Sequence, residues 1–182
     1  MLSDLKARLK GQHLTDPDYA FLLSDEPADE AVVIQCEATS FDAAKADLRT
    51  VAAVRVRGNR ILTSQHIQES FWPTEPAEPA LGRVLHFIGS RPLVGFVVDF
   101  SGGLLDRYVQ PMIGIPLPNR RIDVSELYYS SRTKVPGKNA VDLRLDSILG
   151  ALALPERSSE GAYGTAVAVA MAYVRLRALS GA

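Results

Sequence analysis

Five segments of the chain have the length and hydrophobic pattern of β-strands. The first is a continuous apolar run, and the next two are runs joined at Gly58-Asn59, a dipeptide that favours a tight turn and therefore predicts a hairpin. The fourth is too short for a solitary helix and is typical of a buried strand, and the fifth is only three residues long. The predicted strands are residues 31–36, 50–57, 60–67, 92–98 and 122–124.

Apolar residues at helical spacing predict six helices. The first is a short amphipathic helix that carries its leucines on one face and ends at Gly11. Ser101 stands where it can cap the fourth helix. Prolines predict loops at 71–79 and 130–140. The predicted helices are residues 2–10, 16–23, 80–88, 101–108, 141–152 and 161–179.

The order of these elements predicts the α/β class, with antiparallel strands at one edge of the sheet. An acidic segment with a proline, residues 24–30, divides the chain into an N-terminal helical arm and linker, residues 1–30, and a main domain, residues 31–182. Isolated helices of fewer than about 12 residues are marginal in water, so the arm must pack on its own domain or on a second copy. We expect a homodimer.

Composition removes several classes of function. The 182 residues include 20 Lys and Arg against 21 Asp and Glu, so the chain lacks the net positive charge that would indicate binding to nucleic acid. The single cysteine, Cys36, forms no internal disulfide and belongs to no zinc motif, which favours a reducing, cytoplasmic setting. The start of the chain lacks a secretory apolar stretch, and the run 165–174 is about half the roughly 20 residues that span a bilayer, so we expect no membrane association.

Three segments resemble the motifs of the DnaQ-like (DEDDh) 3′–5′ exonucleases, the proofreading family that includes the epsilon subunit of DNA polymerase III. They are residues 32–42, 92–101 and 160–166, and the resemblance extends over roughly residues 31–178. It implies a ribonuclease H-like exonuclease fold: a mixed five-stranded sheet flanked by helices. The first strand is expected at the centre, with the hairpin on one side and the two short strands on the other.

The residues that carry chemistry in this family are largely replaced. The family's reaction uses two divalent cations held by four carboxylates, and a histidine that acts as general base. Here Gln35, Ser101 and Thr165 stand at three carboxylate positions, Glu160 stands at the histidine position, and Glu37 alone retains its acid. An amide oxygen can touch a metal but supplies no charge. We expect these five positions to converge on one concave site.

The resemblance therefore predicts a catalytically degenerate domain that binds a protein partner, or nucleic acid weakly, and that needs no cofactor. Residues 71–79 are also too short for the segment that contacts the terminal nucleotide in active members. One alternative is an active 3′–5′ exonuclease that hydrolyses single-stranded DNA or RNA through Mg²⁺ or Mn²⁺ on rearranged ligands. Another is a regulatory module that senses a nucleotide in the old site.

Single residues at these motifs have two interpretations each. Glu37 is either a surviving metal ligand or a polar remnant at the end of a strand. Ser101 is a helix cap or a nucleophile, although neither neighbouring motif has a histidine to activate it. Cys36 is a small buried hydrophobe or a reactive thiol, and Glu160 is a remnant or a substitute base.

Basic residues in the second half of the chain are candidates for contacts with phosphate. Arg120 and Arg121 precede the last predicted strand, and Arg132 and Lys134 lie in the predicted loop. Such cations bind phosphates without reading sequence, which would give weak affinity for single strands. The alternative is ordinary solvated surface charge.

Overall fold

The predicted strands form one mixed sheet in the computed structural model, which describes residues 13–133, 141–157 and 161–181. The central strand pairs antiparallel with the hairpin on one side and parallel with the first of the short strands on the other. The order β3-β2-β1-β4-β5 confirms the predicted architecture. The strands are β1 (Glu30–Ala38), β2 (Leu48–Arg57), β3 (Arg60–Ser70), β4 (Leu93–Gly95) and β5 (Arg121–Asp123).

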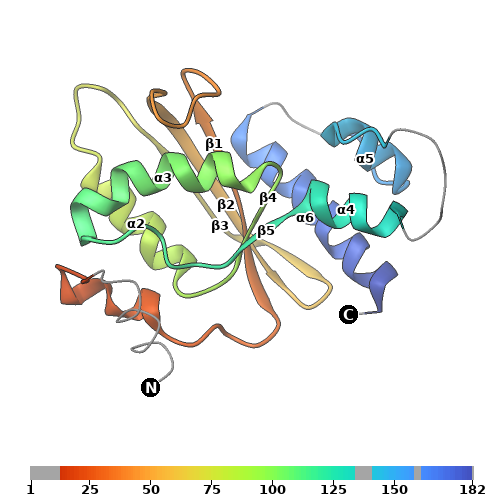
Figure 1. Cartoon of the computed structure of the whole chain (residues 1–182), viewed down its shortest axis with the longest axis horizontal. Coiled ribbons are helices and arrows are strands. Elements are labelled where there is room, and N and C mark those ends of the chain that lie inside the picture. Colours follow the sequence, from red (N-terminus) through yellow and green to blue (C-terminus); the bar gives the residue numbers. More distant parts are fainter. Residues whose placement is uncertain (1–12, 134–140, 158–160, 182) are drawn as a thin grey trace.

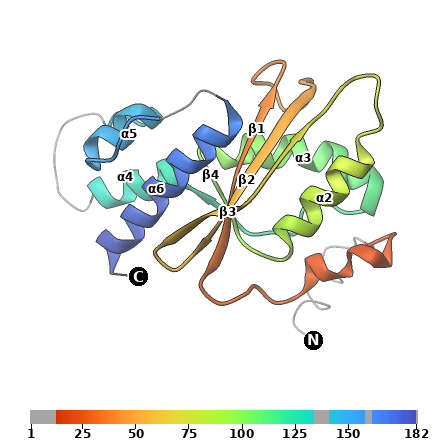
Figure 2. The same cartoon turned by 180° about the vertical axis from the view of Figure 1, so that it is seen from behind.

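Helices cover both faces of this sheet. One face carries α2 and α3, and the other carries α6 with α4 and α5 beside it (Figures 1 and 2). No helix in the described ranges is both long enough and apolar enough to cross a bilayer. The helices are the 3₁₀ helix η1 (Pro17–Leu23), α2 (Glu78–Ile88), α3 (Val98–Ile113), α4 (Val124–Thr133), α5 (Leu145–Ala151) and α6 (Ala162–Ser180).

β1 is buried on both faces, which explains its continuous apolar run. Successive side chains of a strand point to opposite faces, so Val32, Ile34 and Cys36 enter the core beneath α2 and α3. Ala31 and Val33 enter the second core, beneath α6. Alternating polar residues would have left one of these helices without an apolar surface to cover.

The alanines of α6 allow this long helix to lie close to the sheet. The small side chains of Ala166, Ala168, Ala170 and Ala172 are all fully buried, and the helix packs on β1 and β2. A helix that is apolar over most of its circumference is a buried helix. The alanine-rich composition is therefore a packing feature of the second core.

The described part of the N-terminal arm packs on the main domain. Leu22 is 3% exposed and belongs to the core beneath α2 and α3. The rings of Tyr19 and Phe21 contact His86 of α2, with centroids 5.8 and 4.7 Å from the imidazole. Residues 13–23 are thus part of the same body, while the predicted helix 2–10 lies outside the described residues.

Several predicted boundaries were wrong because tertiary contacts set them. Ser101 does not cap α3: the helix begins earlier, at Val98, whose N–H donates to the Asp123 carboxylate at 2.8 Å. The expected loop 130–140 begins inside α4, and its residues 134–140 lie outside the described ranges. The expected helix 141–152 is the shorter α5, because residues 141–144 have no helical structure.

The turn into α3 is strained. Val97 precedes the helix with φ 52° and ψ 52°, the left-handed region, although its side chain is branched at Cβ. That conformation costs an L-residue about 1–2 kcal/mol. Because the Val97 side chain is 51% exposed, its own packing does little to offset this cost.

We predict that Val97→Gly raises the free energy of unfolding by about 1 kcal/mol, because glycine adopts positive φ freely. Urea unfolding followed by circular dichroism measures the change. Val97→Ala is the matched control, since it removes the branch but keeps a Cβ at positive φ. A glycine variant less stable than the natural protein would show that the turn is not strained.

Candidate functional site

The polar side chains near the end of β1 point to the face of the sheet that α6 covers. The alternation that directs Val33 toward α6 also directs Gln35 and Glu37 to that face. Glu37 is exposed, and its Oε1 lies 3.8 Å from the position that a Cβ on Gly161 would occupy. The start of α6 therefore adjoins the end of β1.

Among the described residues, only one of the two polar groups of the Gln35 side-chain amide has a hydrogen-bond partner. Its Nε2 donates to the carbonyl of the next residue, Cys36, at 3.2 Å. Its Oε1 is buried and has no hydrogen-bond partner in the described part of the chain. Buried polar atoms are normally paired, so this acceptor marks the point where a donor or a cation would be favourable.

Ser101 has a structural role beside the same strand. β1 pairs with β4 only at Val32 and Val33, so Cys36 lies beyond the end of β4. Ser101, which is 1% exposed, takes the place of a ladder partner: its Oγ accepts the N–H of Cys36 at 3.3 Å. The Ser101 hydroxyl thus completes the hydrogen bonding of the β1 backbone.

The first turn of α6 completes the site. Thr165 donates its backbone N–H to the carbonyl of Gly161 at 3.1 Å and is half-buried. Through Gly161, this turn adjoins Glu37. Glu160 lies outside the described residues, so its expected position stays a prediction.

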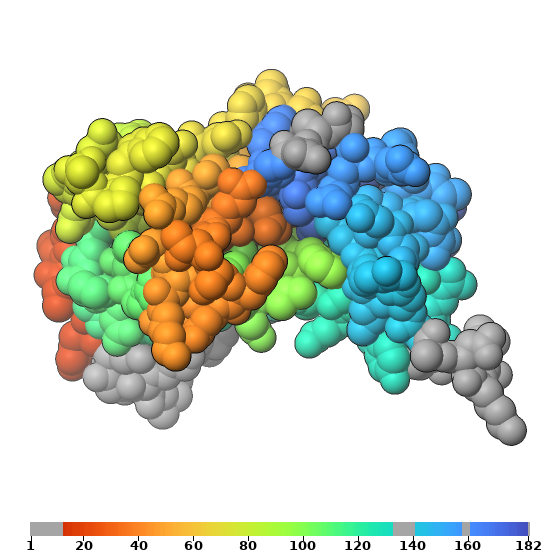
Figure 3. Space-filling model, turned by 90° about the horizontal axis from the view of Figure 1, so that it is seen from above, coloured from red at the N-terminus to blue at the C-terminus, as the bar shows by residue number. Residues whose placement is uncertain are grey.

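The surface is hollowed at this end of the sheet. Figure 3 shows the hollow between the orange connection from β1 to β2 and the blue and cyan helices, with light green atoms of the segment from β4 to α3 at its floor. The aromatic ring of Phe41, 97% exposed on that connection, lies 5.8 Å from the ring of Phe100, the neighbour of Ser101. An exposed aromatic beside the hollow is a feature that sequence reasoning missed.

The donors that the structure describes at this site do not fit a centre of two divalent cations. Such centres need several hard oxygen ligands with negative charge. Glu37 supplies one carboxylate, Gln35 a neutral oxygen, and the Ser101 hydroxyl is already bonded. Among the described residues, no three His, Cys, Asp or Glu side chains are placed to hold one ion.

Cys36 is a buried thiol within the first core. Burial raises its pKa to about 12, and its S–H donates to the Ser101 carbonyl at 3.9 Å. The thiolate is the reactive form of cysteine, and this environment disfavours it. The geometry favours the interpretation of Cys36 as a small hydrophobe.

The arginines considered for phosphate contacts have protein partners. Arg121 pairs with Asp106 at 2.6 Å, and its guanidinium lies so close to Gly102 that a Cβ there would be 2.4 Å from Cζ. Arg120 pairs with Glu26 at 3.1 Å. Arg132 lies over the ring of Tyr128, and Lys134 is outside the described residues.

Asp123 is the carboxylate that sequence reasoning overlooked. At the end of β5, one of its oxygens accepts the N–H of Val98, and the other accepts the N–H of Ser125 at 2.8 Å. It therefore caps both α3 and α4. The run from Asp123 to Glu126 carries the spacing of a capping box and could have predicted the second role.

The comparisons with known proteins identify the fold. No family model matches the chain, and no curated protein is similar to it in sequence. Its structure is similar to E. coli exonuclease I in complex with a dA16 oligonucleotide, with a TM-score of 0.64 and 11% identity, covering 82% of this chain and 41% of that chain. A complex of exonuclease I with SSB-Ct gives a TM-score of 0.63 and 13% identity, covering 84% and 42%.

Cell-death related nuclease 4 is similar to the same degree. Its TM-score is 0.64 at 12% identity, covering 84% of this chain and 65% of that chain. The chain thus has the ribonuclease H-like exonuclease fold, as the motif resemblance implied. It spans about two fifths of exonuclease I, 41% in the complex with dA16, and less than two thirds of the nuclease.

We predict that Ser101→Ala lowers the free energy of unfolding by about 1–3 kcal/mol, because it leaves the buried N–H of Cys36 without an acceptor. Hydrogen exchange measured by NMR should show faster exchange of the Cys36 amide. Ser90→Ala is the matched control: it also removes a hydroxyl bond to a distant residue, Asp25, but an exposed one that water replaces. Equal losses in the two variants would contradict the role of Ser101.

Proposed function

We propose that this chain is a catalytically degenerate exonuclease-like domain that acts by binding, to a protein partner in the first place and to nucleic acid weakly. The observation that carries the proposal is the bond from Cys36 N–H to Ser101 Oγ. A neutral hydroxyl that is buried and already accepts a bond from the backbone of β1 brings no negative charge to a cation site, as a carboxylate would. A carboxylate at that position would have to bring its charge into a core.

The described site also lacks the other metal ligands and the general base that metal-dependent hydrolysis requires. Glu37 is exposed, and among the described residues it belongs to no group of three His, Cys, Asp or Glu side chains that could hold a cation. The position of the general base holds Glu160, and the last motif position holds Thr165. Without metals to bind and activate water, none of these groups generates a nucleophile near the phosphodiester.

The neighbouring structures support a role in binding. Exonuclease I, of which this chain spans 41–42%, has been determined in complex with a dA16 oligonucleotide and with SSB-Ct. In this chain the exposed ring of Phe41 and the exposed side chain of Val97 give the segments around the hollow apolar character. Apolar surface of this kind favours a protein partner.

Cytoplasmic localisation is part of the proposal, because Cys36 is a free thiol.

We predict that the purified protein releases no nucleotides from a labelled single strand of DNA or RNA with Mg²⁺ or Mn²⁺. Gln35→Asp should not restore activity, because one added carboxylate still cannot seat two cations. Glu37→Ala is the control for contaminating nuclease. Robust metal-dependent release that disappears in Glu37→Ala would instead establish an active exonuclease with rearranged ligands.

We also propose that residues 1–12 mediate self-association into a homodimer. Residues 13–23 already pack on their own domain, so the test removes only the segment before them. Sedimentation should give the mass of a dimer for the full chain and of a monomer for a chain that begins at His13. Two monomers, or two dimers, would contradict this proposal.

A further inference from the structure

A second concave surface lies at the other end of α6, between this helix, α4 and the end of α5. The cavity has a volume of about 520 Å³. Thr165 and Leu176 are eleven residues apart, which places the groove about 16 Å along the helix from the first turn of α6. The lining residues that the argument uses are Arg132, Leu152, Arg175, Leu176, Arg177 and Leu179.

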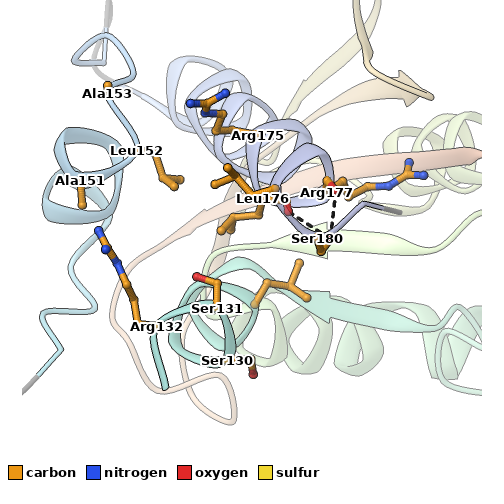
Figure 4. Close-up of a pocket in the computed structure, with 12 residues that line it drawn as sticks. Ser130, Ser131, Arg132, Ala151, Leu152, Ala153, Arg175, Leu176, Arg177 and Ser180 are labelled. Carbon is orange, nitrogen blue, oxygen red and sulfur yellow. Dashed lines mark hydrogen bonds between the residues drawn. The ribbon is translucent and has the colours of Figure 1, made fainter. Parts of the chain in front are cut away.

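The floor of this groove is apolar. Leu152 and Leu176 are 7% and 5% exposed and belong to the second core. Small residues on the three helices, among them Ala151 and Ser131, leave space above them (Figure 4). Leu179 is 58% exposed, and nothing in the described part of the chain covers it. An apolar side chain placed here would be removed from water against leucine.

The rim of the groove is cationic. Of the described residues, three arginines and no aspartate or glutamate line it. Arg177 is paired with Asp29 at 2.9 Å, and Arg132 is held over the ring of Tyr128. Arg175 is exposed and has no hydrogen bond or ion pair within the described ranges. Arg132 comes from α4 and Arg175 from α6, so the mouth presents cations from two helices (Figure 4).

We propose that this groove docks an acidic peptide segment of a protein partner, with one or two apolar side chains on the leucine floor and carboxylates at Arg132 and Arg175. The cavity falls within the roughly 300–1,000 Å³ of ordinary ligand pockets, which suits a short segment. Arginine binds carboxylates in a bidentate manner and serves as a rim contact of this kind. The inference rests on the proposed binding role but uses no residue of the β1 site.

The charge and the apolar floor together decide between ligand classes. Single-stranded nucleic acid would satisfy the arginines but would place phosphates over leucine, and the described lining of the groove has no aromatic ring on which a base could stack. A basic or purely apolar peptide would leave the rim unpaired or repelled. Acidic and apolar groups in one short segment match both parts of the groove.

The test uses fluorescence polarisation with the full chain and a fluorescein-labelled ten-residue peptide, four glutamates followed by spacer residues and a Leu-Leu pair at a free carboxyl terminus. We expect saturable binding. Leu179→Gln and Arg175→Glu should each weaken it about tenfold or more, since each removes one part of the complementarity. Both side chains are exposed, so neither change disturbs the core.

Matched controls make the outcome specific to the groove. Lys45→Glu makes the same change of charge as Arg175→Glu at the connection from β1 to β2, and it should bind like the natural protein. Peptides with lysine for glutamate, or serine for leucine, should not bind. Absence of saturable binding at millimolar peptide, equal binding by Leu179→Gln, or equal competition by a single-stranded oligonucleotide would each overturn the inference. The assay of nucleotide release from a labelled single strand tests separately whether the site at the end of β1 is inactive.

Discussion

The hydrogen bonds of β1 are the constraint on which this structure depends. The strand is nine residues long, pairs with β2 along its length, and meets β4 over only two residues. A central strand cannot leave a buried N–H without an acceptor, so the group beyond β4 must find one outside the sheet. Ser101 supplies it from α3. The same contact ties the first turn of α3 to β1.

Charged side chains near the end of the sheet also bind backbone groups. Asp123 accepts N–H groups from the starts of both α3 and α4, where helix N-termini carry unsatisfied donors. Arg121, two residues before it, pairs with Asp106, and its guanidinium packs against Gly102, where there is no side chain to displace it. These side chains make hydrogen bonds and ion pairs that hold helices to the sheet. The described site therefore contains fewer free carboxylates than its sequence suggests.

The two concave surfaces differ in ways that separate their roles. The hollow at the end of β1 has an exposed acid, Glu37, and an exposed aromatic, Phe41. The groove at the far end of α6 has a leucine floor and an arginine rim. Because the same rigid helix borders both, a partner at either surface would contact one body with two chemically distinct faces. The proposed binding role could therefore use two separate surfaces of one domain.

The sequence by itself determined the five strands and, through the motif resemblance, their order in the sheet. The continuous apolar run of β1 and the Gly58-Asn59 turn are local patterns, and the residues at the motif positions are read directly from the sequence. Only the tertiary structure shows which groups Ser101 and Asp123 contact. Ser101 bonds to a residue 65 positions away, and the start of α3 is set by an aspartate 25 positions later. Local periodicity contains no information about such contacts, and the groove exists only because three helices end near one another.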